Sequence, residues 1–227
     1  MKKTIAIAFM LILATCALFA LEFNINMGAG YTLNSGKVKF AEDSNFQKKP
    51  EMKYSGFNIG LGFNVELNNH LVIYDNLDLV FISDGNVKAK NENYDWKKVT
   101  DVWSKYPSFD GKFMVSEDIG VAYAMHIGLF RLIAGGGFHV DYLSYKFKED
   151  SSKGINSKEN ANMHAGLNIL IQGDFQFSQH FSVFGMLKPS VNLYNSWKQQ
   201  YVGTKKDASD ALVGINMSFV VGVSYRI

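Results

Sequence analysis

The second half of the chain carries a histidine–aspartate cluster with the composition of a chemical site. His139 and Asp141 stand two residues apart, and His164 follows in a later segment with the same alternating pattern. Side chains two residues apart lie on one face of a β-strand, so we expect these residues, with Asp118, on one face of adjacent strands. Two imidazoles and a carboxylate could bind a divalent metal, and a His–Asp pair could activate a nucleophile.

Three hypotheses for this cluster stay open from the sequence: a metal site, a catalytic pair, and a hydrogen-bonded cluster without chemistry. No serine stands obviously beside these residues in the alternating pattern. The sequence has no Walker, dinucleotide-binding, Cys-x-x-Cys or His-Glu-x-x-His pattern. We therefore expect no enzyme activity, no cofactor and no resident metal, with His139, Asp141 and His164 as the candidate ligands if a metal does bind.

The elements that must position this cluster are segments in which apolar residues alternate with polar or small ones. Such a period of two predicts β-strands with one apolar face. Asp75 and Glu117 interrupt the apolar face, and Asp75 could mark a β-bulge. The pattern predicts eight strands, at residues 21–33, 56–67, 70–81, 113–127, 130–143, 162–177, 180–194 and 213–227.

Short and long connections alternate strictly between these strands. Tight turns are expected at 68–69, 128–129 and 178–179, and long polar loops at 34–53, 82–112, 144–161 and 195–211. An even number of antiparallel strands with this alternation is typical of an outer-membrane β-barrel. The predicted fold is all-β: an eight-stranded antiparallel up-and-down transmembrane β-barrel with four long extracellular loops and short periplasmic turns.

The distribution of basic residues separates this fold from a soluble eight-stranded barrel. Of the 23 Lys and Arg residues, 18 fall in the four predicted long loops and two at positions 2 and 3. Only Arg131, Lys188 and Arg226 remain for strands and turns. A Lys or Arg on a lipid-facing surface costs about 2–4 kcal/mol at the bilayer midplane, so a membrane accounts for this segregation.

The N-terminus predicts export. Residues 1–20 have two lysines followed by an apolar run and small residues, as in a secretory signal peptide, and we expect cleavage after Ala20. Cys16, the only cysteine, would be removed with it, and lipidation of Cys16 is the alternative. Residues 21–227 then form one barrel domain, for which an exported address and a net charge of +2 make nucleic acid an unexpected partner.

The C-terminal segment carries a resemblance to a known family. Apolar residues alternate to the end of the chain at Phe219, Val221, Val223, Tyr225 and Ile227. The last of them is Ile227, where the proteins that this segment resembles usually have an aromatic residue. This segment is similar to the assembly signal of the small eight-stranded outer-membrane proteins, among them the OmpA transmembrane domain, OmpX and OmpW. The resemblance implies location in the cell outer membrane, contact with outer-membrane lipid, and recognition by the barrel-assembly machinery.

The expected barrel interior is polar and filled. Strand closure would place Glu22 beside Arg226, and we predict an ion pair between them because a buried charge needs a partner. Glu66, Asp78, Asp174 and Lys188 also point inward by parity and are expected to extend a plug-like network. Because eight strands leave room only for side chains, we expect a structural or surface-interaction role, through loops that contact a host or surface ligand. The alternatives are a narrow, porin-like channel or conduit for small or hydrophobic solutes, as the OmpW resemblance implies, and an outer-membrane lipid-modifying enzyme.

Overall fold

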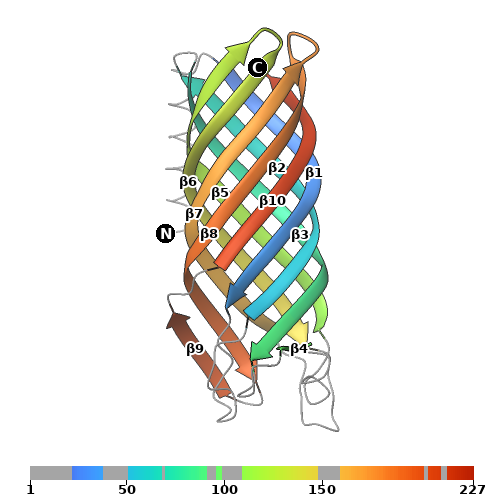
Figure 1. Ribbon diagram of the computed structural model, residues 1–227, viewed down its shortest axis with the longest axis vertical. Coiled ribbons are helices and arrows are strands. Elements are labelled where there is room, and N and C mark those ends of the chain that lie inside the picture. The colour runs from blue at the N-terminus through green and yellow to red at the C-terminus, as the bar shows by residue number, and fades with distance from the viewer. Residues whose placement is uncertain are drawn as a thin grey trace, which may run out of the picture.

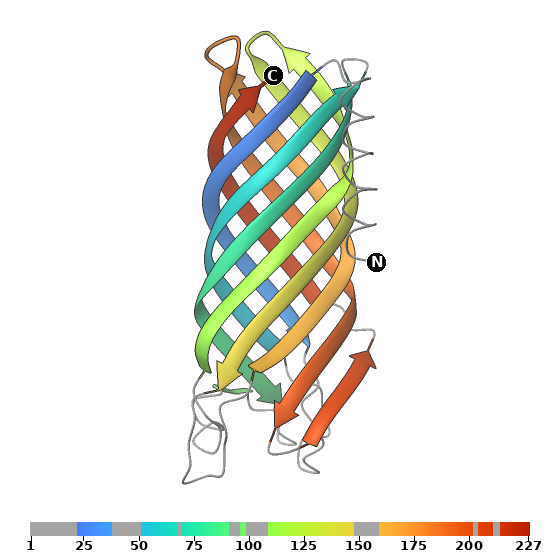
Figure 2. The same ribbon diagram turned by 180° about the vertical axis from the view of Figure 1, so that it is seen from behind.

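The structure is a computed structural model that describes residues 22–37, 51–67, 70–90, 96–98, 109–147, 159–201, 204–210 and 214–227. Across these residues the chain forms a closed, tall barrel whose strands run steeply tilted around a common axis (Figures 1 and 2). The predicted signal peptide with Cys16, and the turn residues Asn68 and Asn69, lie outside the described residues.

Eight long strands make the barrel wall. They are β1 (Glu22–Lys37), β2 (Glu51–Leu67), β3 (Leu71–Lys90), β5 (Phe109–Ile127), β6 (Phe130–Phe147), β7 (Glu159–Gln176), β8 (Phe181–Tyr201) and β10 (Gly214–Arg226). Each pairs antiparallel with its neighbour, and β10 pairs with both β8 and β1, which closes the sheet. The predicted eight-stranded, up-and-down antiparallel barrel is therefore confirmed.

The two ends of the barrel differ. Short connections join β2 to β3, β5 to β6 and β7 to β8 at one end, and β10 ends there beside the start of β1, with Arg226 opposite Asn24. Gly128, in the turn between β5 and β6, has a positive φ of 62°, a conformation that glycine adopts without steric cost. We call this end the turn end and the opposite end the loop end (Figure 1).

The strands continue beyond the predicted bounds at the loop end. β1 reaches Lys37, β3 reaches Lys90 and β8 reaches Tyr201, so the predicted starts of these loops at 34, 82 and 195 are wrong. Two further strands lie at this end: β4 (Trp96–Lys98) pairs with β3, and β9 (Thr204–Asp210) pairs with β8 in a hairpin that projects past the barrel. The apolar alternation stops where a strand becomes polar on both faces, but backbone hydrogen bonds continue the ladder.

The predicted bulge at Asp75 is also wrong. Asp75 pairs in unbroken register with Phe63 on β2 and with Ile119 on β5. The register shifts instead at Ser55/Gly56, at Asp110/Lys112 and at Ala165/Gly166. Asp75 keeps the strand alternation and points outward, because a polar residue on an apolar face does not by itself require an extra residue in the strand.

The outer face of the barrel is apolar all the way round. Large apolar side chains alternate outward on every wall strand, among them Met27, Ile59, Leu79, Val121, Phe138, Ile169, Val191 and Phe219. Exposed apolar surface on this scale marks contact with a membrane or a partner rather than with water. The part of the chain that the structure describes contains no helix long and apolar enough to cross a membrane.

A layer of apolar side chains lies in the middle of the barrel interior, beside the buried amides of Asn26 and Asn76. Its members are each at most 5% exposed: Val72, Tyr74, Ala122, Ala124, Ile133, Leu170, Phe184, Met186 and Val220. Glycine makes room for the largest ring, because a Cβ on Gly120 would lie 2.6 Å from the hydroxyl oxygen of Tyr74. We call this set the apolar layer; it separates two polar networks.

Candidate functional site

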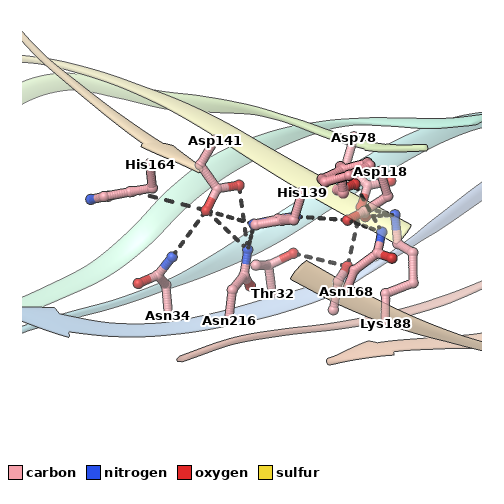
Figure 3. A network of polar contacts seen from close by, with 12 residues as sticks. Thr32, Asn34, Asp78, Asp118, His139, Asp141, His164, Asn168, Lys188 and Asn216 are labelled. Atoms are coloured by element: carbon pink, nitrogen blue, oxygen red, sulfur yellow. Dashed lines mark hydrogen bonds and ion pairs between the residues drawn. The ribbon is translucent and has the colours of Figure 1, made fainter. Parts of the chain in front are cut away.

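Six ionisable side chains form one connected network in the loop-end half of the interior (Figure 3). Lys188 Nζ lies 2.7 Å from Asp78 Oδ2 and 3.1 Å from Asp118 Oδ2. Asp118 Oδ1 lies 2.7 Å from His139 Nδ1, and His139 Nε2 lies 3.0 Å from Asp141 Oδ2. His164 Nδ1 is 4.0 Å from the same oxygen of Asp141. We call this set the upper network, taking the loop end as up, although the loop end is drawn at the bottom of Figure 1.

Strand register explains how the upper network forms. Asp118 on β5 is the direct cross-strand partner of His139 on β6, and Asp141 on β6 is the partner of His164 on β7. Directly opposed side chains have Cβ atoms about 4.5–5.5 Å apart, which is close enough for a hydrogen bond. The cluster predicted from parity is therefore brought together in the structure, and Lys188 reaches it from β8.

Amide and hydroxyl side chains surround the upper network. Asn168 Nδ2 donates to Asp118 Oδ1 over 2.7 Å, and Ser218 Oγ donates to Asp78 Oδ2 over 3.2 Å. Asn34 and Asn216 donate to the carboxylate of Asp141 over 3.3–3.4 Å. The sequence analysis did not single out these residues, although each occupies an inward position in an alternating strand.

The geometry bears on the metal and catalytic hypotheses. Both ring nitrogens of His139 face carboxylate oxygens, an arrangement satisfied by the two N–H donors of a charged imidazolium. An imidazole with both nitrogens donating has no lone pair for a metal. Within the described ranges, no group of three or more His, Cys, Asp or Glu residues is arranged to hold a metal ion.

A second network lies near the turn end, and Arg131 is its hub. Arg131 Nη2 lies 2.6 Å from Asp174 Oδ2, and Arg131 Nη1 lies 3.1 Å from Glu66 Oε2. His126 Nε2 contacts the other oxygen of Glu66 over 2.7 Å. The guanidinium of Arg226 contacts the carboxylate of Glu22, so the structure brings together the two residues for which the sequence predicts an ion pair. We call this set the lower network.

The single network expected from Glu66, Asp78, Asp174 and Lys188 is therefore two networks. All four side chains are buried and point inward, but Glu66 and Asp174 belong to the lower network and Asp78 and Lys188 to the upper one. The apolar layer lies between them: on β6, Ile133 stands between Arg131 and His139. Parity alone assigns a residue to a face of the strand but gives no height in the barrel, so the sequence does not predict two separate networks.

Arg131 was not assigned a role from the sequence. One feature of the sequence could have identified it: Arg131 is one of three basic residues outside the predicted loops and signal peptide. The other two, Lys188 and Arg226, each lie in an ion pair with a carboxylate on another strand. Each of these three basic residues therefore contacts a carboxylate from another strand.

The segment resembling an assembly signal lies on the outer face of β10. Its five residues alternate outward and are between 42% and 67% exposed: Phe219, Val221, Val223, Tyr225 and Ile227. This exposure places the segment where another protein could contact it. Recognition by assembly machinery stays a prediction.

A closed barrel with an apolar outer face and buried charges inside defines a transmembrane β-barrel of the outer-membrane type. The crystal structure of OprG from Pseudomonas aeruginosa supports this fold, with a TM-score of 0.58, 15% identity, and coverage of 92% of this chain and 96% of that one. Neisserial surface protein A aligns with a TM-score of 0.49 and 12% identity over 89% of this chain and 96% of that one. No protein-family model and no curated protein sequence matches the chain.

Proposed function

We propose that this protein is a closed, non-conducting barrel of the outer membrane that acts as a structural or surface-interaction protein through its loop end. One observation carries the proposal: buried side chains, the apolar layer among them, occupy the barrel interior between the two charged networks. On this proposal the loop end faces outward from the cell and the turn end faces the periplasm.

The apolar layer opposes ion flow for a physical reason. An ion that entered from the upper network would have to lose its hydration shell beside Tyr74, Leu170 and Phe184, which are each at most 5% exposed and offer mainly hydrocarbon. Apolar constrictions in channels stop conduction because water leaves them. A small pocket beside the layer is lined by Asn26 and Asn76 as well as by Phe184. The interior of an eight-stranded barrel is only wide enough for its own side chains, so this pocket is too narrow to replace the hydration shell of an ion.

The loop end offers surface for contact. The β8–β9 hairpin extends past the wall, and β9 pairs with β8 alone within the described sheet. A short strand with one open edge can add a strand from another chain. In addition, 18 of the 23 Lys and Arg residues fall in the four predicted long loops, which belong to this end. Their positive charge favours contact with an anionic surface.

A conductance measurement tests the closed interior. The barrel, residues 21–227, would be refolded, its folding verified by a heat-dependent gel shift, and then inserted into planar lipid bilayers. We expect folded, electrically silent protein. Resolved current steps from the unaltered barrel would overturn the proposal and favour the alternative function, a narrow channel for small solutes.

A binding measurement tests the loop end. Cells that carry the barrel would be compared with cells carrying a variant in which residues 204–210 are replaced by a short Gly-Ser linker. We expect the variant to fold and to lose adherence to the surfaces that the parent binds. Equal adherence of the two, with equal amounts of folded barrel, would contradict a role for this hairpin.

A further inference from the structure

A pocket opens at the turn end of the barrel, and residues of the lower network form part of its lining. The centre of a water-sized molecule can reach about 30 Å³ of space inside it. Polar side chains from five strands and one turn line it, chiefly Asn24, His126, Arg131, Asp174, His180 and Arg226. The proposed surface role does not use this pocket, which is at the opposite end of the barrel.

We propose that this pocket binds an oxyanion, that is, the carboxylate or phosphate group of a periplasmic solute. The first support is the charge of the lining. Arg131 and Arg226 both line the pocket, together with His126 and His180, whereas Asp174 is the one acidic residue among the lining side chains of the described chain. Glu22 and Glu66 contact the two arginines without lining the pocket. These carboxylates and Asp174 contact all three guanidinium nitrogens of Arg131, so the guanidinium donors that the pocket offers an anion are the Arg226 N–H groups that do not contact Glu22.

The second support is a buried donor without a partner. Asn24 is 2% exposed and lines the pocket, and its amide nitrogen Nδ2 has no hydrogen-bond partner among the described residues. A buried donor left unsatisfied is destabilising, so such a group calls for an explanation. An oxyanion in the pocket would accept from Asn24 and, at the same time, from a neighbouring guanidinium.

The third support is the way the arginines are held. Arg131 is 8% exposed and is fixed by Asp174 and Glu66, so its side chain is ordered before any ligand arrives. Arg226 is about a quarter exposed, with Glu22 on one side, and it lies directly opposite Asn24 in the β1–β10 register. A planar guanidinium donates in a fork that matches carboxylate and phosphate oxygens. Pre-ordered donors also lower the entropic cost of binding.

The test uses the full chain purified from membranes in a zwitterionic detergent. The unfolding temperature is measured by the heat-dependent gel shift in inorganic phosphate, in acetate and in chloride at matched ionic strength. We expect phosphate or acetate, but not chloride, to raise the unfolding temperature saturably, by roughly 5–10 °C at a hundredfold excess over Kd. A shift with phosphate alone assigns the site to phosphate groups, and a shift with acetate assigns it to carboxylates. Equal behaviour in all three salts overturns the proposal.

Three variants separate binding from stability. Asn24→Leu removes the unpartnered donor, so the ligand-dependent shift is lost while the unliganded protein is not destabilised. Arg226→Gln also loses the shift, whereas Glu22→Gln, which releases the Arg226 guanidinium from its partner, binds the oxyanion at least as tightly as the parent. If the Glu22–Arg226 pair had a purely structural role, Arg226→Gln and Glu22→Gln would lower the unfolding temperature alike and would not differ in their response to the oxyanion. A retained shift in Asn24→Leu contradicts the proposal even if Arg226→Gln fails to fold.

A matched control lies higher in the barrel. Both amide atoms of Asn26 lack partners among the described residues, and Asn26 is 1% exposed, but it does not line this pocket. Asn26→Leu therefore removes an unsatisfied amide of the same type from the same strand. We expect its ligand-dependent shift to equal that of the parent, and a lost shift would show that the effect is not local to the pocket.

Discussion

Lys188 and Asp78 form an ion pair inside the barrel, with Nζ and Oδ2 2.7 Å apart and each side chain at most 3% exposed. The same ammonium lies 3.1 Å from Asp118, so one cation holds two carboxylates that come from β3 and β5. Such a cation is hard to replace, because removing one partner of a buried pair leaves an uncompensated charge.

We predict that Lys188→Met destabilises the barrel by about 3–5 kcal/mol. Asp78 and Asp118 would both stay buried, with His139 as the remaining cation near Asp118. The free energy of unfolding in urea, measured on barrels in lipid vesicles, checks this. Asp78→Asn serves as the comparison, since it removes one carboxylate and leaves Lys188 paired with Asp118. A Lys188→Met barrel as stable as the parent would show that the pair is not needed.

The Glu22–Arg226 pair is more exposed, so its expected contribution is smaller. Each side chain is about a quarter exposed, and water screens the attraction. We predict that Arg226→Ala lowers the free energy of unfolding by about 1 kcal/mol. A double-mutant cycle with Glu22→Gln isolates the coupling between the two residues. Strictly additive effects of the two substitutions would mean that the contact contributes nothing to stability.

Among the side chains that the structure describes, Asp75 and Glu117 are the charged residues on the otherwise apolar outer face of the wall strands. They lie diagonally across the β3–β5 pairing, since Asp75 opposes Ile119 and Glu117 opposes Leu77. An acidic side chain on a lipid-facing surface is costly, though less so than Lys or Arg. We predict that Asp75→Leu stabilises the barrel by about 1–2 kcal/mol in lipid vesicles. Lower stability of this variant in lipid would indicate that Asp75 has a favourable partner there.

The apolar layer is predicted to be the barrier to ions. Replacing Tyr74 and Phe184 together by serine would remove two rings from the layer and leave hydroxyl groups in their place. We expect the folded double variant to conduct in planar bilayers where the parent is silent. Leu170→Ile, which conserves apolar volume, is the control and should stay silent. A silent double variant would place the barrier elsewhere in the barrel.

The sequence alone determined the wall of this protein. The alternation from Ile215 to Tyr225 identifies both faces of β10, because a strand has a period of two and a bilayer demands one apolar face. Closure then makes the first and last strands neighbours, which is why the contact between Glu22 and Arg226 could be predicted from their places in the chain.

Only the tertiary structure shows how the charged side chains of the interior are arranged. Arg131 meets Glu66 across 65 positions of sequence, and Lys188 meets Asp78 across 110, through contacts that no local pattern encodes. Parity says only that such residues point inward. Their height follows from strand tilt and from the register around the whole barrel, and that height divides the charges into two networks with an apolar layer between them. The physical reason is that backbone hydrogen bonds set the register and are nearly the same for every residue type. The register therefore cannot be predicted from which side chains it brings together.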